Sequence, residues 1–362
     1  MQKTDELRTR RIDRLVAPAA LAAALSVSAA MADNVLRVRQ RIERILHGED
    51  PRLLVIIGPC SIHDTDAALE YARRLNPRRV KYQDRLEIVM RTYFEKPRTV
   101  VGWKGLIADP GLDGSFRVND GLEVARRLLL AVNELGLPTA TEFLDMVTGQ
   151  YIADLIASAL SCPVGFKNGT DGNIQIAIDA IRAARASHLF LSPDKQGQMT
   201  IYQTGGNPYG HIIMRGGKVP NYQPQAIDDA CAQLASFGLP AHLLVDFSHG
   251  NSQKQYLRQL DVARAVCQPL RDGSRQVVGI MAESNLVGGN QSLGGRYPSR
   301  LWPVHYRRLP GLGGQRAPAG NVKRRGGLPL LAVQSAARAG HKHPPHDAAV
   351  SAVSRVARPA AL

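Results

Sequence analysis

The sequence predicts an α/β fold of the (β/α)8-barrel type, for two reasons. Apolar runs of strand length recur along the chain and are mostly separated by stretches of helical character. Several of these runs end in a polar or charged residue, as strands do at the active face of such a barrel. The 362 residues are enough for a barrel of about 250 residues with extensions.

The predicted strands follow one another in a regular order. We expect them near 53–57, 86–91, 138–143, 163–167, 188–191, 242–247 and 276–281, with helical stretches such as 121–136 and 174–186 between them. A closed barrel needs eight strands, so these runs leave it one strand short. The short interval precedes the strand at 163–167, because 145–160 supplies only one loop and one helix.

Residues 1–48 predict a helical N-terminal arm ahead of a barrel at 49–293. A basic stretch, an apolar stretch and Ala30-Met31-Ala32 imitate a secretory signal peptide. Glu6 and Asp13 interrupt the basic stretch and Pro18 the apolar one, so we expect an arm followed by a helix at 33–46.

No apolar run approaches the ~20 residues of a membrane span. The four cysteines show no paired spacing, which indicates a reducing compartment, the cytoplasm.

Three potential metal ligands each follow a separate apolar run: Cys60, His249 and Glu283. In a barrel the carboxyl ends of the strands meet at one face. A lone buried cysteine is more often packing, and a histidine or glutamate at a strand end often only caps a loop. The three together with nearby basic residues predict a metal site. A thiolate, an imidazole and a carboxylate suit Mn, Fe, Co or Zn without discriminating among them.

Basic residues also gather after the apolar runs. They are Arg91, Lys96, Arg98, Lys167 and Arg215, with the hydroxyl of Thr99 beside them. Arginine can clamp a phosphate or carboxylate with two parallel hydrogen bonds, and lysine adds a compact charge. Each could instead be a solvated loop charge, the commoner fate of these residue types. Five at the ends of buried runs predict a substrate with more than one anionic group.

Six motifs carry a family resemblance: GPCSIHD (58–64), RTYFEKPRTVVGWKG (91–105), GFKNGTDG (165–172), HIIMRGGK (211–218), DFSHGN (246–251) and AESNLVGGNQS (282–292). In this order they resemble the short bacterial type I 3-deoxy-D-arabino-heptulosonate 7-phosphate (DAHP) synthases, which begin the shikimate pathway. The resemblance runs to about Leu293. The stretches 5–15, 139–156 and 190–204 are most similar to the tryptophan-sensitive isoenzyme.

The resemblance implies condensation of phosphoenolpyruvate with erythrose 4-phosphate to give DAHP and phosphate. It places phosphoenolpyruvate against Arg91, Lys167 and Arg215, and erythrose 4-phosphate against Lys96, Arg98 and Thr99. A divalent ion on Cys60, His249 and Glu283 would act as a Lewis acid. Arg91, Lys96, Cys60 and His249 are the implied catalytic residues. The resemblance also implies a homo-oligomer built partly through the N-terminal arm, and feedback by an aromatic amino acid, tryptophan.

Two features depart from the family. Its members carry a further strand, ending in an arginine that helps hold phosphoenolpyruvate, where this chain joins Ile156 directly to Ala157. The fourth strand and that arginine are therefore missing. Beyond Leu293 the resemblance stops, and a disordered tail rich in Gly, Pro, Arg and Ala is predicted at 294–362. Shifting the codons of 301–316 by one base can yield the family's C-terminal segment, with its fourth metal ligand, an aspartate. We therefore interpret the tail as frameshifted.

The charge distribution bears on the remaining alternatives. Most of the net charge of +15 lies in the tail, which holds 12 basic residues and one acidic residue. A nucleic-acid-binding tail is the least favoured interpretation, because only Tyr297, Trp302 and Tyr306 accompany its arginines. Neither nucleic acid nor a membrane is an expected partner. An active synthase and an inactive remnant of the family that acts at most as a binding protein remain open.

Overall fold

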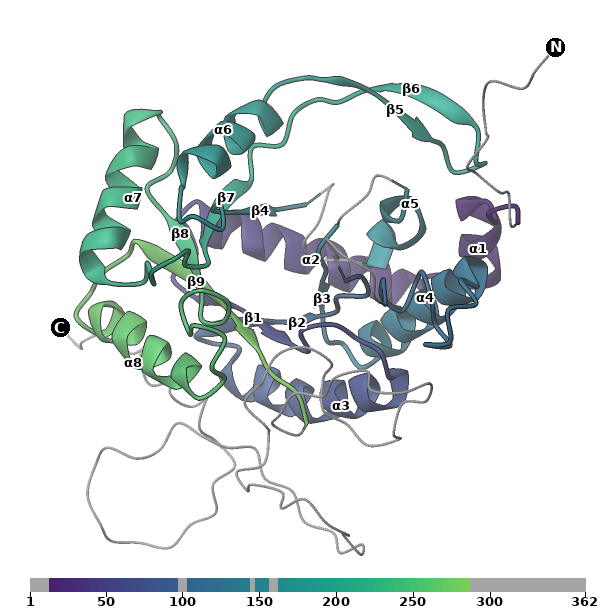
Figure 1. Ribbon diagram of the computed structural model, residues 1–362, viewed down its shortest axis with the longest axis horizontal. Coiled ribbons are helices and arrows are strands. Elements are labelled where there is room, and N and C mark those ends of the chain that lie inside the picture. The colour runs from purple at the N-terminus through teal and green to yellow at the C-terminus, as the bar shows by residue number, and fades with distance from the viewer. Residues whose placement is uncertain (1–12, 97–102, 144–146, 156–161, 287–362) are drawn as a thin grey trace, which may run out of the picture.

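A computed structural model describes residues 13–96, 103–143, 147–155 and 162–286. Its core is one curled sheet of seven parallel strands in the order β3-β2-β1-β9-β8-β7-β4. These are β1 (Leu53–Gly58), β2 (Leu86–Arg91), β3 (Thr139–Ala140), β4 (Val164–Lys167), β7 (Gly210–Met214), β8 (Leu243–Asp246) and β9 (Val277–Glu283). Figure 1 shows the curled sheet surrounded by helices, as in a barrel that has not closed.

Helices cover the outer face of the sheet. They are α3 (Thr65–Tyr82), α4 (Val118–Glu134), α6 (Gln175–Ala184), α7 (Pro224–Ser236) and α8 (Arg258–Arg271). Their apolar faces pack with the outward residues of the strands, such as Val55 and Ile88, in one large buried cluster. The short elements α1 (Pro18–Ala24), α5 (Gly149–Ile152) and η1 (Ala153–Leu155) pack beside α4. This arrangement buries both faces of a parallel sheet, as such sheets require.

Helix α2 (Ala29–Leu46) closes the amino-end opening of the curled sheet and in Figure 1 runs across behind it. Its apolar residues join the inward residues of the strands in a second buried cluster: Val38, Ile42, Ile45 and Leu46 with Leu54, Ile56, Val89, Ile213, Leu244 and Met281. The helix begins four residues earlier than the predicted 33–46, because the Ser28 side chain accepts a hydrogen bond from the backbone N–H of Met31 and caps it.

The sheet is open between β3 and β4, which lie at its two ends and are not paired with each other. The family's fourth strand would lie at this place in a closed barrel. Among the described residues no strand lies there, which confirms the predicted partial barrel. The joint at 156–157 itself lies outside the described residues. Strand β3 is also shorter than the predicted 138–143, because it pairs only with β2, through Met90 and Arg91.

The prediction that 188–191 forms a strand of the barrel is wrong. The stretch at 188–191 forms β5 (Leu189–Pro193), which pairs antiparallel with β6 (Met199–Gln203) in a separate hairpin. In Figure 1 this hairpin arches away from the sheet toward α1. The barrel strand is instead β7, inside the HIIMRGGK motif. Four of the five residues of β5 are partly or fully exposed, because β5 pairs only with β6, whereas β7 lies within the sheet and is almost wholly buried.

Among the described residues, no single helix is long and apolar enough to span a membrane, and α1 with α2 meets that test only as a pair bent by 119°. The N-terminal arm is not a detached segment, because α2 contributes to the barrel core. The boundaries at 48 and 293 stay predictions, and the tail at 294–362 lies outside the described residues.

Candidate active site

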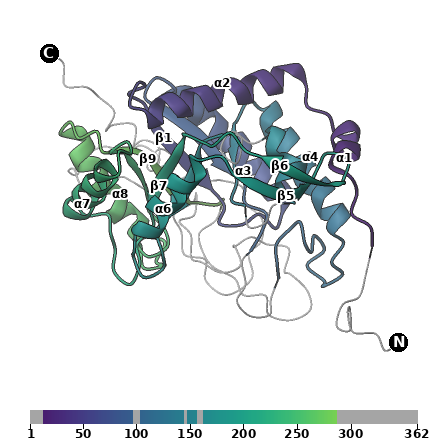
Figure 2. The same ribbon diagram turned by 90° about the horizontal axis from the view of Figure 1, so that it is seen from above.

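Charged side chains line the inner rim of the sheet at the carboxyl ends of its strands. Side chains alternate along a strand, so the strands that place Leu54 and Val89 in the inner core also place their last inward residues on this rim. The rim residues are Arg91 on β2, Glu142 just after β3, Lys167 on β4, Asp246 on β8 and Glu283 on β9. Figure 2 gives a second view of the same strands beneath α2.

Arg91 is the most buried cation of the rim, with 3% of its side chain exposed. Its guanidinium lies 3.0 Å from Glu142 Oε1 and 3.6 Å from Glu283 Oε1, and donates to the Cys60 carbonyl at 3.1 Å. Burial alone would lower the pKa of this group, but Glu142 and Glu283 raise it above its ordinary value, so Arg91 stays charged. Its buried Nε has no hydrogen-bond partner within the described part of the chain, which leaves a donor for a bound anion.

Lys167 and Arg215 extend the cationic side of the rim. Lys167 Nζ lies 2.7 Å from Glu142 Oε1 and 3.8 Å from Asp246 Oδ2. Burial would raise the pKa of Glu142, but Arg91 and Lys167 hold it well below its usual range, so the carboxylate is ionised. Arg215 directly follows β7, and its buried Nε also lacks a partner among the described residues.

The loops that carry Arg215 and His249 are locked together by close backbone contact. Gly216 has φ +70°, and a Cβ there would lie 2.5 Å from the backbone N of Asn251. The Gly250 N–H donates to the Arg215 carbonyl at 2.9 Å. His249 itself adopts φ +54°, an uncommon conformation for a residue with a side chain. Local strain therefore fixes His249 at the rim.

A carboxylate orients His249. Asp246 Oδ2 lies 2.8 Å from His249 Nδ1, and the Ser248 hydroxyl donates to Asp246 Oδ1 at 2.6 Å. Burial lowers the pKa of His249, although Asp246 works in the opposite direction. The other ring nitrogen, Nε2, lies 3.9 Å from Glu283 Oε1. A neutral imidazole held at Nδ1 by a carboxylate is the usual support for a metal-binding histidine.

Cys60 reaches the same rim from the end of β1. Its buried thiol accepts from Lys96 Nζ at 3.1 Å. The three predicted metal ligands thus end β1, β8 and β9, which are adjacent in the sheet. Within the described ranges, however, no group of three His, Cys, Asp or Glu side chains is close enough to hold an ion. Arg91 lies between two of the predicted ligands, donating to the Cys60 carbonyl and pairing with Glu283. The donor types and the orientation of His249 fit a divalent ion, and the site stays a prediction.

The structure brings together Cys60, Arg91, Lys96, Lys167 and the residues at the ends of β7, β8 and β9, while Arg98 and Thr99 lie outside the described residues. Sequence reasoning missed Glu142 and Asp246. Asp246 had a signal, because it is a carboxylate within a buried apolar run. It also missed Asn168, whose side chain accepts from the Arg215 backbone N–H at 2.7 Å and so supports the anion side of the rim.

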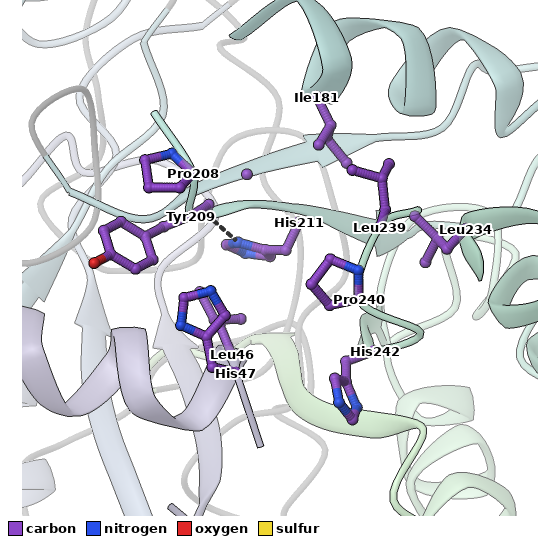
Figure 3. A pocket seen from close by; sticks show the side chains of 11 residues that line it. Leu46, His47, Ile181, Pro208, Tyr209, His211, Leu234, Leu239, Pro240 and His242 are labelled. Carbon is purple, nitrogen blue, oxygen red and sulfur yellow. Dashed lines mark hydrogen bonds between the residues drawn. The ribbon is translucent and has the colours of Figure 1, made fainter. Parts of the chain in front are cut away.

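A separate small cavity lies at the amino ends of the strands, away from the rim (Figure 3). It has a volume of about 20 Å³ and is lined by Leu46, His47, Ile181, Pro208, Tyr209, Gly210, His211, Leu234, Leu239, Pro240 and His242. Burial lowers the pKa of His211 to about 4, so this histidine is neutral near pH 7. Such a volume holds one water rather than a substrate.

Comparisons with known proteins agree with the fold. The profile described as the DAHP synthetase I family matches residues 27–158 and 155–302. The Trp-sensitive phospho-2-dehydro-3-deoxyheptonate aldolase of Salmonella typhi is 67% identical over 311 residues, covering 81% of this chain and 89% of the relative. The enzyme of the same name from Escherichia coli K12 is 66% identical over 316 residues, 82% of this chain and 91% of the relative. The solved phospho-2-dehydro-3-deoxyheptonate aldolase of Francisella tularensis aligns with a TM-score of 0.79 at 39% identity, covering 83% of this chain and 93% of that structure.

The matches also mark the missing segment. The family profile matches in two pieces that meet at 155–158, at the gap between β3 and β4. The Salmonella alignment is 311 residues long, but it covers only 81% of the 362 residues of this chain, or about 293. About 18 positions of the alignment thus have no residue in this chain. The relative therefore has residues that this chain lacks, enough for a strand and part of a helix. With a matching profile over most of its length and relatives at 66–67% identity, the chain belongs to the DAHP synthetase I family.

Proposed function

We propose that the chain condenses phosphoenolpyruvate with erythrose 4-phosphate to give DAHP and phosphate. The observation that carries the proposal is the rim itself, where Arg91, Lys167 and Arg215 lie at the carboxyl ends of three strands. Phosphoenolpyruvate has a carboxylate and a phosphate, which such a set of cations suits. The identity of 66–67% over four-fifths of the chain favours an enzyme over an inactive remnant.

The residues divide between the two substrates. Arg91, Lys167 and Arg215 bind the anionic groups of phosphoenolpyruvate, and Arg91 and Arg215 each have a buried Nε available as a donor. Lys96, next to Cys60, meets erythrose 4-phosphate together with Arg98 and Thr99. This arrangement would place the two reacting molecules side by side at the rim, and orientation of this kind removes much of the entropic barrier to a bimolecular reaction.

The chemistry forms one carbon–carbon bond and releases phosphate. The methylene carbon of phosphoenolpyruvate attacks the aldehyde carbon of erythrose 4-phosphate, whose oxygen takes a proton. A water adds to the carbon that bears the phosphate, and phosphate leaves to give the ketone. A divalent ion held by Cys60, His249 and Glu283 supplies a Lewis acid for the aldehyde or the water. Asp246 keeps His249 oriented for that role, and burial favours the neutral imidazole.

The proposal is tested by an assay that follows loss of phosphoenolpyruvate. Loss should require erythrose 4-phosphate and a divalent ion, and one phosphate should appear for each phosphoenolpyruvate consumed. Loss that is independent of the aldehyde would contradict the proposal.

Substitution of Cys60 is expected to remove divalent-ion binding. Cys60→Ala should lower the bound metal per chain, measured by elemental analysis after dialysis, because it removes one of the three ligands. Cys231→Ala is a matched control, since Cys231 is a buried thiol on α7, in the cluster between the helices and the outer face of the sheet. Equal metal content in both variants would count against Cys60 as a ligand.

Tryptophan is the proposed feedback ligand. The relatives are named Trp-sensitive. In this chain α1, α5 and the hairpin tip meet, where Lys195 Nζ donates to the Gln150 carbonyl at 2.6 Å and the Ala19 N–H donates to the Lys195 carbonyl at 2.7 Å. Calorimetry with tryptophan, phenylalanine and tyrosine should show preference for tryptophan. Preference for either of the others would overturn the proposal.

A homo-oligomer is the proposed assembly. The hairpin exposes four large apolar side chains, each at 65–73%: Leu189, Leu191, Met199 and Ile201. An isolated two-stranded ribbon is only marginally stable in water, and an apolar surface of this kind usually marks a contact. Leu191→Asp should shift the mass measured by light scattering toward the monomer. Thr200→Asp on the same hairpin is the control, and an equal shift in both variants would argue against an apolar contact.

The four cysteines are buried, and none of them forms a disulfide in the structure. Free buried thiols are typical of a reducing compartment, which supports the cytoplasm as the proposed location.

A further inference from the structure

We propose that Glu142 is a positioning residue whose ion pairs with Arg91 and Lys167, together called the clasp, join the two sides of the barrel opening. The clasp holds both cations in place for the anionic substrate. The part that concerns substrate rests on the proposed function. The clasp itself rests on the geometry of the rim, where one carboxylate contacts cations on both sides of the opening.

The opening leaves β4 with a neighbour on one side only. Strand β4 pairs with β7, and β3 pairs with β2, but the described strands β3 and β4 share no ladder. All four residues of β4 are at least partly exposed, whereas those of β1 and β2 are buried throughout. An edge strand of four residues is weakly held, and Lys167 is its last residue.

Glu142 is anchored from the β2 side of the opening. The Thr92 N–H donates to the Ala140 carbonyl at 2.7 Å, and the Thr141 hydroxyl donates to the Thr92 carbonyl at 2.8 Å. These hydrogen bonds hold the residues that follow β3 against the end of β2, beyond the two-residue ladder between the strands. Arg91 then contacts the Glu142 carboxylate at 3.0 Å.

Lys167 is anchored from the β7 side. It lies opposite Ile213 in the ladder, and the next residue, Asn168, donates from its side chain to the Gly216 carbonyl at 3.1 Å. Its ammonium reaches across to Glu142 at 2.7 Å, while Asp246 on its own side is 3.8 Å away. The shorter ion pair therefore spans the opening.

Charge and exposure explain why this contact matters. Arg91 and Lys167 are like charges that share one carboxylate oxygen, and without it they would repel each other across a side that no described strand closes. Glu142 and Lys167 are 30% and 20% exposed, compared with 3% or less for Arg91, Asp246 and Glu283. Glu142 and Lys167 are therefore more accessible to water than these three residues.

Glu142→Gln tests the clasp, because it keeps the shape of the side chain and removes the charge. Glu123→Gln is the matched control, since Glu123 pairs with Arg127 on the exposed face of α4. Hydrogen exchange followed by mass spectrometry should show at least about tenfold faster exchange of the β4 amides in Glu142→Gln, with β9 unchanged. Calorimetry should show at least about tenfold weaker binding of phosphoenolpyruvate, with binding of erythrose 4-phosphate unchanged. Glu142→Asp, which keeps the charge, should recover part of both losses.

Other outcomes would overturn the proposal. Unchanged β4 exchange means that Glu142 does not hold the edge strand. Faster exchange in both β4 and β9, with both substrates weakened, means a general loss of stability rather than positioning. Tighter binding of phosphoenolpyruvate means that Glu142 only opposes the anion. If the unsubstituted chain binds no phosphoenolpyruvate, the proposed function fails, while hydrogen exchange still decides the clasp.

Discussion

Restoring the missing strand together with the C-terminal reading frame should raise turnover at least about a thousandfold above that of the chain as it stands. The strand closes the barrel between β3 and β4, and by the family resemblance it returns an arginine to the anion site. By the same resemblance, the restored frame would return the fourth metal ligand, an aspartate. Loss of one preorganised donor of this kind commonly costs about a hundredfold to a thousandfold in turnover, so the two losses together justify the expected size.

The experiment needs three repaired chains. One receives the segment of a relative between η1 and β4, one receives the family's C-terminal segment, and one receives both. We expect large recovery only in the third, because the anion site and the metal site are both needed for the bond-forming step. A Gly/Ser insert of equal length at the first position controls for the added length. Turnover of the unrepaired chain near that of a relative would show that neither missing residue is needed.

Most of the architecture was predictable, because apolar runs mark the buried strands and the polar residues after them mark the carboxyl ends of those strands. The β1, β2, β8 and β9 runs were placed to within a few residues, and each leads to a predicted site residue at the rim. The missing strand was also visible, as an interval too short for a strand and a helix. The hairpin was not, because a short apolar run such as β5 looks the same whether its partner is a barrel strand or β6.

The site was predictable in composition but not in pairing. Cys60, Arg91, His249 and Glu283 stand in conspicuous motifs, so their place at strand ends could be inferred. The contacts of Glu142 could not, because it meets Arg91 through the pairing of β3 with β2 and meets Lys167 across the opening of the sheet. Such contacts depend on three-dimensional register, which a single sequence does not give.

Arg91→Ala should abolish measurable turnover and also destabilise the fold. Arg91 is the counter-ion of Glu142 and Glu283, and Glu283 is only 1% exposed. Removing one partner of a buried ion pair leaves an uncompensated charge and typically costs about 3–5 kcal/mol. The substitution also removes a donor to phosphoenolpyruvate. Arg127→Ala is the control, because the Arg127–Glu123 pair on α4 is exposed and worth little.

The pH dependence of that destabilisation tests its electrostatic origin. The pKa of Glu142 is lowered in the folded chain, chiefly by Arg91 and Lys167 acting against burial. A carboxyl whose folded pKa is depressed stabilises the fold above its unfolded pKa, and this contribution is lost as pH falls toward the folded pKa. The difference in thermal midpoint between the parent chain and Arg91→Ala should therefore be largest near pH 7 and shrink below about pH 4, near the unfolded glutamate pKa. A difference that stays constant from pH 7 to pH 3 would mean that Arg91 stabilises the barrel by packing rather than by its charge.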